Sequence, residues 1–184
     1  MKTLKFSALA FLFLGLVGCS GEIAWKTDKS TGFYEIDIPE RMEVMDDLNP
    51  DATSQFGYIK EEGDAAKEHY VIVLMETKEE IATYDLGFEL DAMSYSELAL
   101  QALEGGLDSY EVLTKNAKVE KVNGMDCVKN EISGSIGDVN VFYKLGLFEG
   151  EKAFYQVLTW TIEDQKDEFG PHMDKIINSF KETK

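Results

Sequence analysis

The sequence predicts an α+β fold: an antiparallel β-sheet that ends in a C-terminal meander of four strands and is flanked by helices. Three observations predict it. Apolar runs separated by turn residues fill positions 119–162, a helical apolar stripe follows them, and a strand-like alternation opens the domain after residue 32. A chain of 184 residues fits one domain. We expect this domain to span residues 33–184.

The opening strands come from alternation and from an apolar run. Residues 33–38 place an apolar side chain at every second position, and Pro39 ends the strand. Residues 42–45 are expected to return antiparallel to it. Residues 54–60 and 69–77 predict two further strands, separated by the polar residues 61–67. The run in 69–77 is apolar on both faces, so this strand is expected in the centre of a sheet.

The first helix is expected after residue 93. Ser94 and Glu97 match a capping box, and apolar residues at helical spacing follow them. Gly105 and Gly106 are expected to end this helix by supplying a positive φ.

Turn residues divide the meander. Asn123-Gly124 suits a type I′ turn between strands 119–122 and 125–133. Gly137-Asp138 offers a second tight turn before the next strand, 139–147. A turn at 149–152 leads into strand 154–162.

The closing helix has one apolar stripe, and Gly170-Pro171 is expected to break or kink its first turns. The stripe consists of Phe169, Met173, Ile176, Ile177 and Phe180.

The N-terminus predicts export. Lys2 and Lys5 precede an uncharged apolar run at residues 6–17, and twelve residues are too few for a membrane span, which needs ~20. A charged start and an apolar run of this length are typical of a secretory signal peptide.

The run closes on Leu16-Val17-Gly18-Cys19, which resembles the lipobox of bacterial lipoproteins. The resemblance implies cleavage between Gly18 and Cys19 and covalent attachment of acyl chains, such as palmitate, to Cys19. Residues 1–18 are then the signal peptide, and residues 19–32 the lipidated N-terminus and a short tether. Acyl chains anchor a protein to a membrane without spanning it. Ser20 resembles the second residue of lipoproteins sent to an outer membrane, where the host has one.

The charge argues against two classes of partner. Lys and Arg number 18 against 35 Asp and Glu, a net charge of −17, and removal of residues 1–18 takes it to −19. Such a surface repels phosphate groups, so neither a nucleic-acid partner nor direct binding of the surface to anionic lipid headgroups is expected. With Cys19 lipidated, Cys127 has no disulfide partner within the chain.

Several stretches resemble the PsbP-like family. They are the strand at 33–39, the loop Asp47-Leu48-Asn49, the Asn123-Gly124 hairpin and the closing residues 177–181. The resemblance implies an α/β/α sandwich over residues 32–181. Members mostly act as binding or accessory modules without a shared active site, so the resemblance transfers no functional residue.

Candidate reactive groups are few. Cys127 is a possible nucleophile, but His69 and His172 are the only histidines, and neither has a spacing that places it beside Cys127. The same two histidines are a possible metal pair, without the motif that typical zinc sites show. In both cases a structural role is the favoured interpretation.

Acidic and aromatic groups have the same two interpretations. Asp46, Asp47, Asn49 and Asp51 offer oxygen ligands as calcium loops do, but their spacing departs from the EF-hand and favours a solvated loop. The carboxylates at 163–164 and 167–168 suit a helix N-terminus. Four meander aromatics are interpreted as core rather than pocket: Tyr143, Phe154, Tyr155 and Trp160.

The sequence therefore predicts a membrane-anchored lipoprotein that acts as a binding or accessory module in the bacterial cell envelope. Its partners are membrane lipid and an envelope protein or small ligand. We expect no catalytic residues, metal or cofactor. A metal- or thiol-dependent envelope enzyme and a spacer domain without a ligand remain as alternatives.

Overall fold

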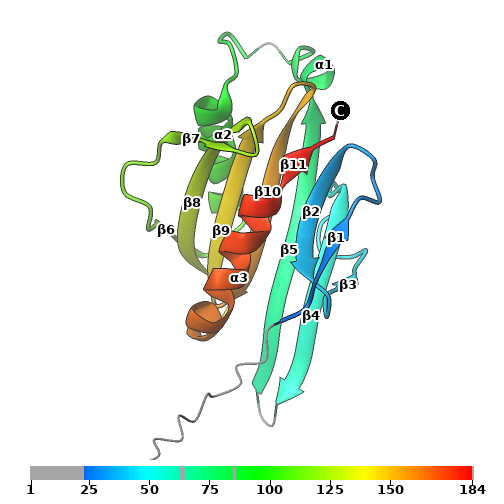
Figure 1. Ribbon diagram of the computed structural model, residues 1–184. Coiled ribbons are helices and arrows are strands. Elements are labelled where there is room, and N and C mark those ends of the chain that lie inside the picture. The colour runs from blue at the N-terminus through cyan, green and yellow to red at the C-terminus, as the bar shows by residue number, and fades with distance from the viewer. Residues whose placement is uncertain (1–22, 63–64, 85, 184) are drawn as a thin grey trace, which may run out of the picture.

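An eight-stranded antiparallel sheet forms the centre of the computed structural model, which describes residues 23–62, 65–84 and 86–183 (Figure 1). Its strands run in the order β3-β4-β5-β10-β9-β8-β6, and β7 also pairs with β8. The strands are β3 Glu43–Val44, β4 Ser54–Glu62, β5 Ala65–Thr77, β6 Ser109–Val112, β7 Val119–Val122, β8 Met125–Ile136, β9 Val139–Glu149 and β10 Ala153–Ile162. The predicted α+β class is confirmed.

The four-strand meander is confirmed. Strands β7 to β10 follow one another in the chain, and each is antiparallel to the next. Asn123 and Gly124 have φ values of 50° and 91°, the left-handed conformations that a type I′ turn requires. Strand β6, which also pairs with β8, was not predicted, because its residues are mostly exposed and show no apolar alternation.

Strand β5 lies between β4 and β10, so its predicted central position is confirmed. The expected separation at residues 61–67 is wrong, since β4 runs to Glu62 and β5 starts at Ala65. Pairing continues through Lys60↔Lys67. Polar side chains at the far end of this hairpin leave no hydrophobic signal to mark how far the strands extend.

A second, three-stranded sheet consists of β1 Trp25–Asp28, β2 Tyr34–Pro39 and β11 Lys181–Glu182. The predicted strand before and at Pro39 is confirmed as β2, whose inward side chains are fully buried. Strand β1 falls in the range 19–32 that the sequence analysis assigned to a tether. It pairs with β2 from Trp25↔Pro39 to Asp28↔Ile36. Four residues with polar side chains at the middle positions give too little pattern to predict it.

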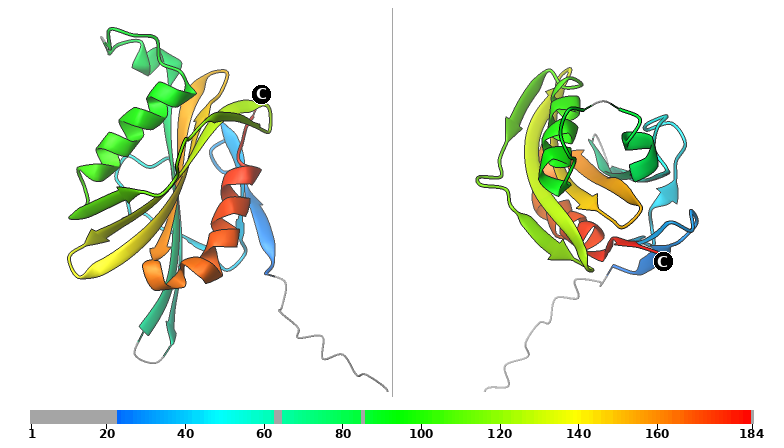
Figure 2. Two further views of the ribbon diagram at one scale, coloured as in Figure 1. Left: turned by 90° about the vertical axis from the view of Figure 1, so that its left-hand side faces the viewer. Right: turned by 90° about the horizontal axis from the view of Figure 1, so that it is seen from above.

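Helices cover both faces of the large sheet, as Figure 2 shows in its left view. Helix α2 (Ala92–Glu104) lies on one face, and α3 (Lys166–Ser179) lies on the other together with β2. The predicted apolar stripe is buried at every position: Phe169, Met173, Ile176, Ile177 and Phe180.

Of the two outcomes expected at Gly170-Pro171, the break is wrong, because α3 is continuous from Lys166 to Ser179 after a short 3-10 helix at Glu163–Gln165; the kink stays a prediction. Pro171 removes one N–H, whose helical acceptor would be the carbonyl of Asp167. Asp167 lies at an exposed position, where water can satisfy the freed carbonyl.

The N-terminus of α2 also differs from the prediction. Its N-cap is Asp91, whose carboxylate accepts a hydrogen bond from the backbone N–H of Ser94, so Ser94 is the third helical residue and not the cap. An aspartate caps a helix as well as a serine does, so the pattern allowed both starts. The helix ends before Gly105 as predicted, but Gly105 has a φ of −62° and supplies no left-handed turn.

The short strand β3 and the short helix α1 also differ from the prediction. Residues 42–45 contain β3, which pairs with β4 through Glu43↔Gly57 and not with the first strand. The chain turns after Pro39, whose carbonyl accepts from the backbone N–H of Met42, and buried Met42 fixes the new direction. Helix α1 (Lys78–Ile81) was not predicted; one turn is too short to show a period.

An aromatic cluster around Phe180 joins the two sheets. The Phe180 ring lies 4.8 Å from Phe148 of β9, 5.1 Å from Tyr155 of β10 and 5.1 Å from Tyr34 of β2, between ring centroids. All four side chains are almost completely buried. The C-terminal end of α3 and the first sheet are therefore held on the large sheet by one set of contacts.

The close approach of α3 to β9 gives a testable prediction at Gly146. A Cβ there would lie 2.6 Å from Cγ2 of Ile177 and 2.7 Å from Cε2 of Phe148. We expect Gly146→Ala to lower the free energy of unfolding by about 1–3 kcal/mol, as overpacking does, in a denaturant titration.

Gly106→Ala is the matched control. Its Cβ would meet only the carbonyl oxygen of Leu103, at 3.5 Å, so we expect little change. An equal loss of stability in both variants would contradict the packing argument.

Candidate functional site

The only arginine and both histidines of the chain meet in one place. Arg41 follows β2, His69 lies in β5 and His172 lies in α3. The imidazole rings of His69 and His172 are 6.4 Å apart between centroids, and positive charge on Arg41 acts on both. We name Arg41, His69 and His172 the Arg–His cluster.

Local structure explains each position. His69 is on the same face of β5 as Val71 and Val73, because side chains of a strand alternate, and all three are fully buried. His172 lies three residues after buried Phe169 in α3, and the two rings are 6.0 Å apart. Arg41 is carried there by the turn after β2.

Aromatic rings enclose the cluster. The guanidinium carbon of Arg41 lies 4.1 Å from the centroid of the Tyr58 ring and 5.5 Å from that of Phe169. Trp25 of β1 approaches His172 edge-on at 6.0 Å. Cation–π contacts stabilise a guanidinium but do not neutralise its charge.

Four nitrogens of the cluster are buried without a hydrogen-bond partner among the described residues. They are Nε and Nη2 of Arg41 and Nδ1 of both His69 and His172. The other ring nitrogen of His69, Nε2, is hydrogen-bonded to Oγ1 of Thr159 at 2.9 Å. Buried polar groups nearly always have a hydrogen-bond partner. Four buried nitrogens without one in a single cluster therefore mark it as a candidate binding site.

The cluster is monocationic at neutral pH. Burial, and then the positive charges of His172 and Arg41, lower the pKa of His69 to about 3. The pKa of His172 is also lowered, mainly by burial and by Arg41, while Glu168 opposes the shift. Both imidazoles are therefore neutral at pH 7, and the cluster carries the charge of Arg41.

The structure brings the proposed histidine pair together but does not favour a metal there. No group of three or more His, Cys, Asp or Glu residues that could hold a metal occurs in the described ranges. The guanidinium of Arg41 adds repulsion for any cation at this position.

The candidate calcium loop, which contains Asp46, Asp47, Asn49 and Asp51, lies beside Arg41. Asp46 and Asp47 line a cavity of about 470 Å³ together with Arg41 and Tyr58. Asn49 instead accepts a hydrogen bond from the backbone N–H of Asp51, which is a local turn contact.

Cys127 is remote from both histidines. It is fully buried, and burial raises the pKa of its thiol to about 12. Strand register places it in one row with Met75 of β5, and His69 is six residues further along that strand, roughly 20 Å away. A thiolate activated by either histidine is not supported by this arrangement.

The remaining candidates have structural roles. Glu163 forms an ion pair with Lys166, and Glu168 forms one with Lys67. The meander aromatics divide between the cores on the two faces of the sheet, and the expectation of core packing is confirmed for Tyr143, Phe154 and Tyr155.

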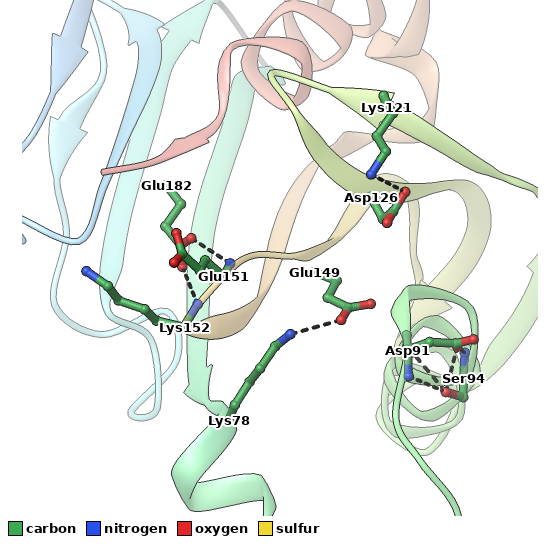
Figure 3. A network of polar contacts seen from close by, with 9 residues as sticks. All are labelled: Lys78, Asp91, Ser94, Lys121, Asp126, Glu149, Glu151, Lys152 and Glu182. Carbon is green, nitrogen blue, oxygen red and sulfur yellow. Dashed lines mark hydrogen bonds and ion pairs between the residues drawn. The ribbon is translucent and has the colours of Figure 1, made fainter. Parts of the chain in front are cut away.

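A second polar network lies at the opposite end of the sheet (Figure 3). The carboxylate of Glu182 accepts hydrogen bonds from the backbone N–H groups of Glu151 and Lys152, and from the Tyr155 hydroxyl at 2.8 Å. Lys78 is paired with Glu149 nearby. These groups satisfy one another and fasten the β9–β10 turn to β11, so they form a structural lock.

The predicted cleavage and lipidation residues, Gly18 and Cys19, lie outside the described residues. No helix in the described ranges combines the length and the apolar character needed to cross a membrane.

Arg41 is the functional candidate that the sequence analysis missed. Its signal was available, since it is the single arginine in a chain with 35 acidic residues. Nothing in its local sequence, however, indicates that it folds toward two histidines 28 and 131 positions later.

No protein-family model and no curated protein matches the sequence. Several solved structures, however, are similar to this one in fold. Cyanobacterial PsbP (CyanoP) from Synechocystis is 18% identical, with a TM-score of 0.59, over 92% of this chain and 99% of that one. LpqN of Mycobacterium tuberculosis, described as involved in cell envelope biogenesis, is 10% identical, with a TM-score of 0.54, over 90% and 88%.

PA94 of Pseudomonas aeruginosa, of unknown function, is 11% identical, with a TM-score of 0.53, over 84% of this chain and 94% of that one. These similarities concern the fold. The predicted PsbP-like α/β/α sandwich is confirmed.

The buried state of His69 predicts acid sensitivity. An unfolded histidine takes up a proton below pH ~6.5, whereas His69 in the folded protein stays neutral down to about pH 3. Its contribution to stability is complete above pH ~6.5 and is lost as the pH falls toward 3, by about 2 kcal/mol at pH 5.

The measurement is urea unfolding at pH 7 and pH 5 for the wild type and for His69→Asn, which cannot titrate here. We expect the wild type to lose about 2 kcal/mol more than the variant between these pH values. Equal losses would show that His69 is not held neutral.

Proposed function

We propose that this protein is a lipid-anchored binding module of the bacterial cell envelope, attached to a membrane through Cys19. The observation that carries the proposal is the lipobox at residues 16–19, preceded by a charged start and an apolar run of signal-peptide length. The envelope role described for LpqN, which shares the fold, supports the location.

The Arg–His cluster supports binding as the role of the domain. It offers four unpartnered polar atoms inside a rigid frame formed by a strand, a helix and a turn. Sites built on such elements hold their donors in fixed positions, which favours a defined ligand.

The anchor is tested by lipid labelling. In bacteria that express the full chain and are grown with labelled palmitate, we expect the wild type to carry the label and to lose residues 1–18. Cys19→Ala should carry no label and keep the signal peptide, because the thiol that receives the lipid is absent. Gel mobility and intact mass report both changes.

Cys127→Ala is the matched control, since it removes the other cysteine of the chain. We expect it to be labelled and processed like the wild type. Labelling that persists in Cys19→Ala would contradict the proposed anchor.

A further inference from the structure

One edge of the Arg41 guanidinium has no hydrogen-bond partner among the described residues. Nε and Nη2 are the two nitrogens whose N–H groups point in parallel along one edge of the guanidinium plane. Both are buried and unpartnered among the described residues. This edge is the fork that binds two oxygens of one carboxylate or phosphate group.

The histidines add donors to this fork. Thr159 can donate its hydroxyl proton to Nε2 of His69, which leaves Nδ1 of neutral His69 as an N–H donor. The unpartnered Nδ1 of His172 has the same option. No protonation of either ring is required, so the cluster presents up to four N–H groups and one fixed positive charge.

Charge decides which ligand fits. A cation is repelled by Arg41, and a water molecule can accept hydrogen bonds but leaves the guanidinium charge without a counter-ion. An anion satisfies both the donors and the charge. Lys175, whose ammonium lies 3.9 Å from the Trp25 ring centroid, adds positive potential on the same side of α3.

The nearest carboxylates do not supply the counter-ion. Glu43, Asp46 and Asp47 line the outer cavity beside Arg41, yet none of them forms an ion pair with it in the described structure. The loop just after Asp47 is held in place, because the side-chain oxygen of Gln55 accepts hydrogen bonds from the backbone N–H groups of Leu48 and Asn49. Glu168 of α3 is engaged by Lys67.

We propose that the Arg–His cluster is a binding site for an oxyanion, the carboxylate or phosphate group of a small molecule or of a lipid headgroup. Arg41 binds two of its oxygens through Nε–H and Nη2–H, and His69 and His172 donate to it through Nδ1. The site does not depend on lipidation of Cys19, so it stands or falls separately from the proposed anchor.

The test uses the two histidines as reporters, since the chain has no others. The full-length protein in detergent micelles is titrated with inorganic phosphate and, separately, with acetate, at constant ionic strength. Imidazole nitrogen NMR signals and the melting temperature are followed. For a soluble oxyanion, we expect saturable shifts of both imidazole signals and a higher melting temperature with at least one of the two anions; for a lipid headgroup, we expect the shifts with vesicles alone.

Arg41→Gln removes the charge and the fork, and we expect it to weaken anion affinity at least about tenfold. Lys152→Gln is the matched control: it removes one exposed positive charge at the opposite end of the sheet and should stay within about twofold of the wild type. If circular dichroism shows that Arg41→Gln is unfolded, Arg41→Lys replaces it. It keeps the charge without the fork, and we expect the same direction of change.

Vesicles distinguish the two sources of the oxyanion. Phosphatidylglycerol vesicles that shift the imidazole signals, with phosphatidylcholine vesicles and free anions inert, identify a lipid headgroup; shifts with free phosphate or acetate identify a soluble anion. The proposal is overturned if neither free anion nor either vesicle shifts the imidazole signals. It is equally overturned if the Arg41 variant that folds responds like the wild type, or if Lys152→Gln loses the response.

Discussion

The contacts of Phe180 hold the covering layer of this protein in place. Its ring meets Tyr34 from the first sheet and Phe148 and Tyr155 from the large sheet, all in a dry environment. Aromatic side chains bury more area than any other type and fix geometry through edge-on and tilted contacts. One cluster therefore positions β2 and α3 together. Arg41 and His172 reach His69 only because these two elements are fixed relative to β5.

The resulting arrangement is energetically unusual for so acidic a chain. Two nitrogens of the partly buried Arg41 side chain, Nε and Nη2, have no hydrogen-bond partner among the described residues, although 35 acidic residues provide many possible counter-ions. Arg41 instead packs on the rings of Tyr58 and Phe169, and its charge acts on two neutral imidazoles. Local departures from the rules of packing tend to occur where a protein does something besides fold. The polar lock at Glu182, in which donors and acceptors are matched, shows the contrast within the same molecule.

Local sequence predicted those elements whose signal is local. The Asn123-Gly124 turn, the α3 stripe and the central position of β5 follow from turn chemistry, helical period and continuous apolar character. Strands β1 and β6 were not predicted, because a short strand with many polar residues has no clear pattern of its own. It forms by pairing with the edge of a neighbouring strand. The site depends on contacts between segments far apart in the sequence. His69 and His172 were recognised as candidates, but they meet because α3 packs on β9 and β10, next to β5. Arg41 is placed there by a turn that carries no recognisable motif.

If Cys19 carries the proposed lipid, strand β1 shortens the segment of chain between that lipid and the folded domain. A tether ending at residue 32 would reach about 50 Å from Cys19 to Phe33, whereas only six residue steps separate Cys19 from Trp25, at most about 20 Å. Trp25 pairs with Pro39 and touches His172. An anchored domain would thus carry the Arg–His cluster at its membrane-proximal end, within reach of the headgroup layer, and turn the Glu182 end outward.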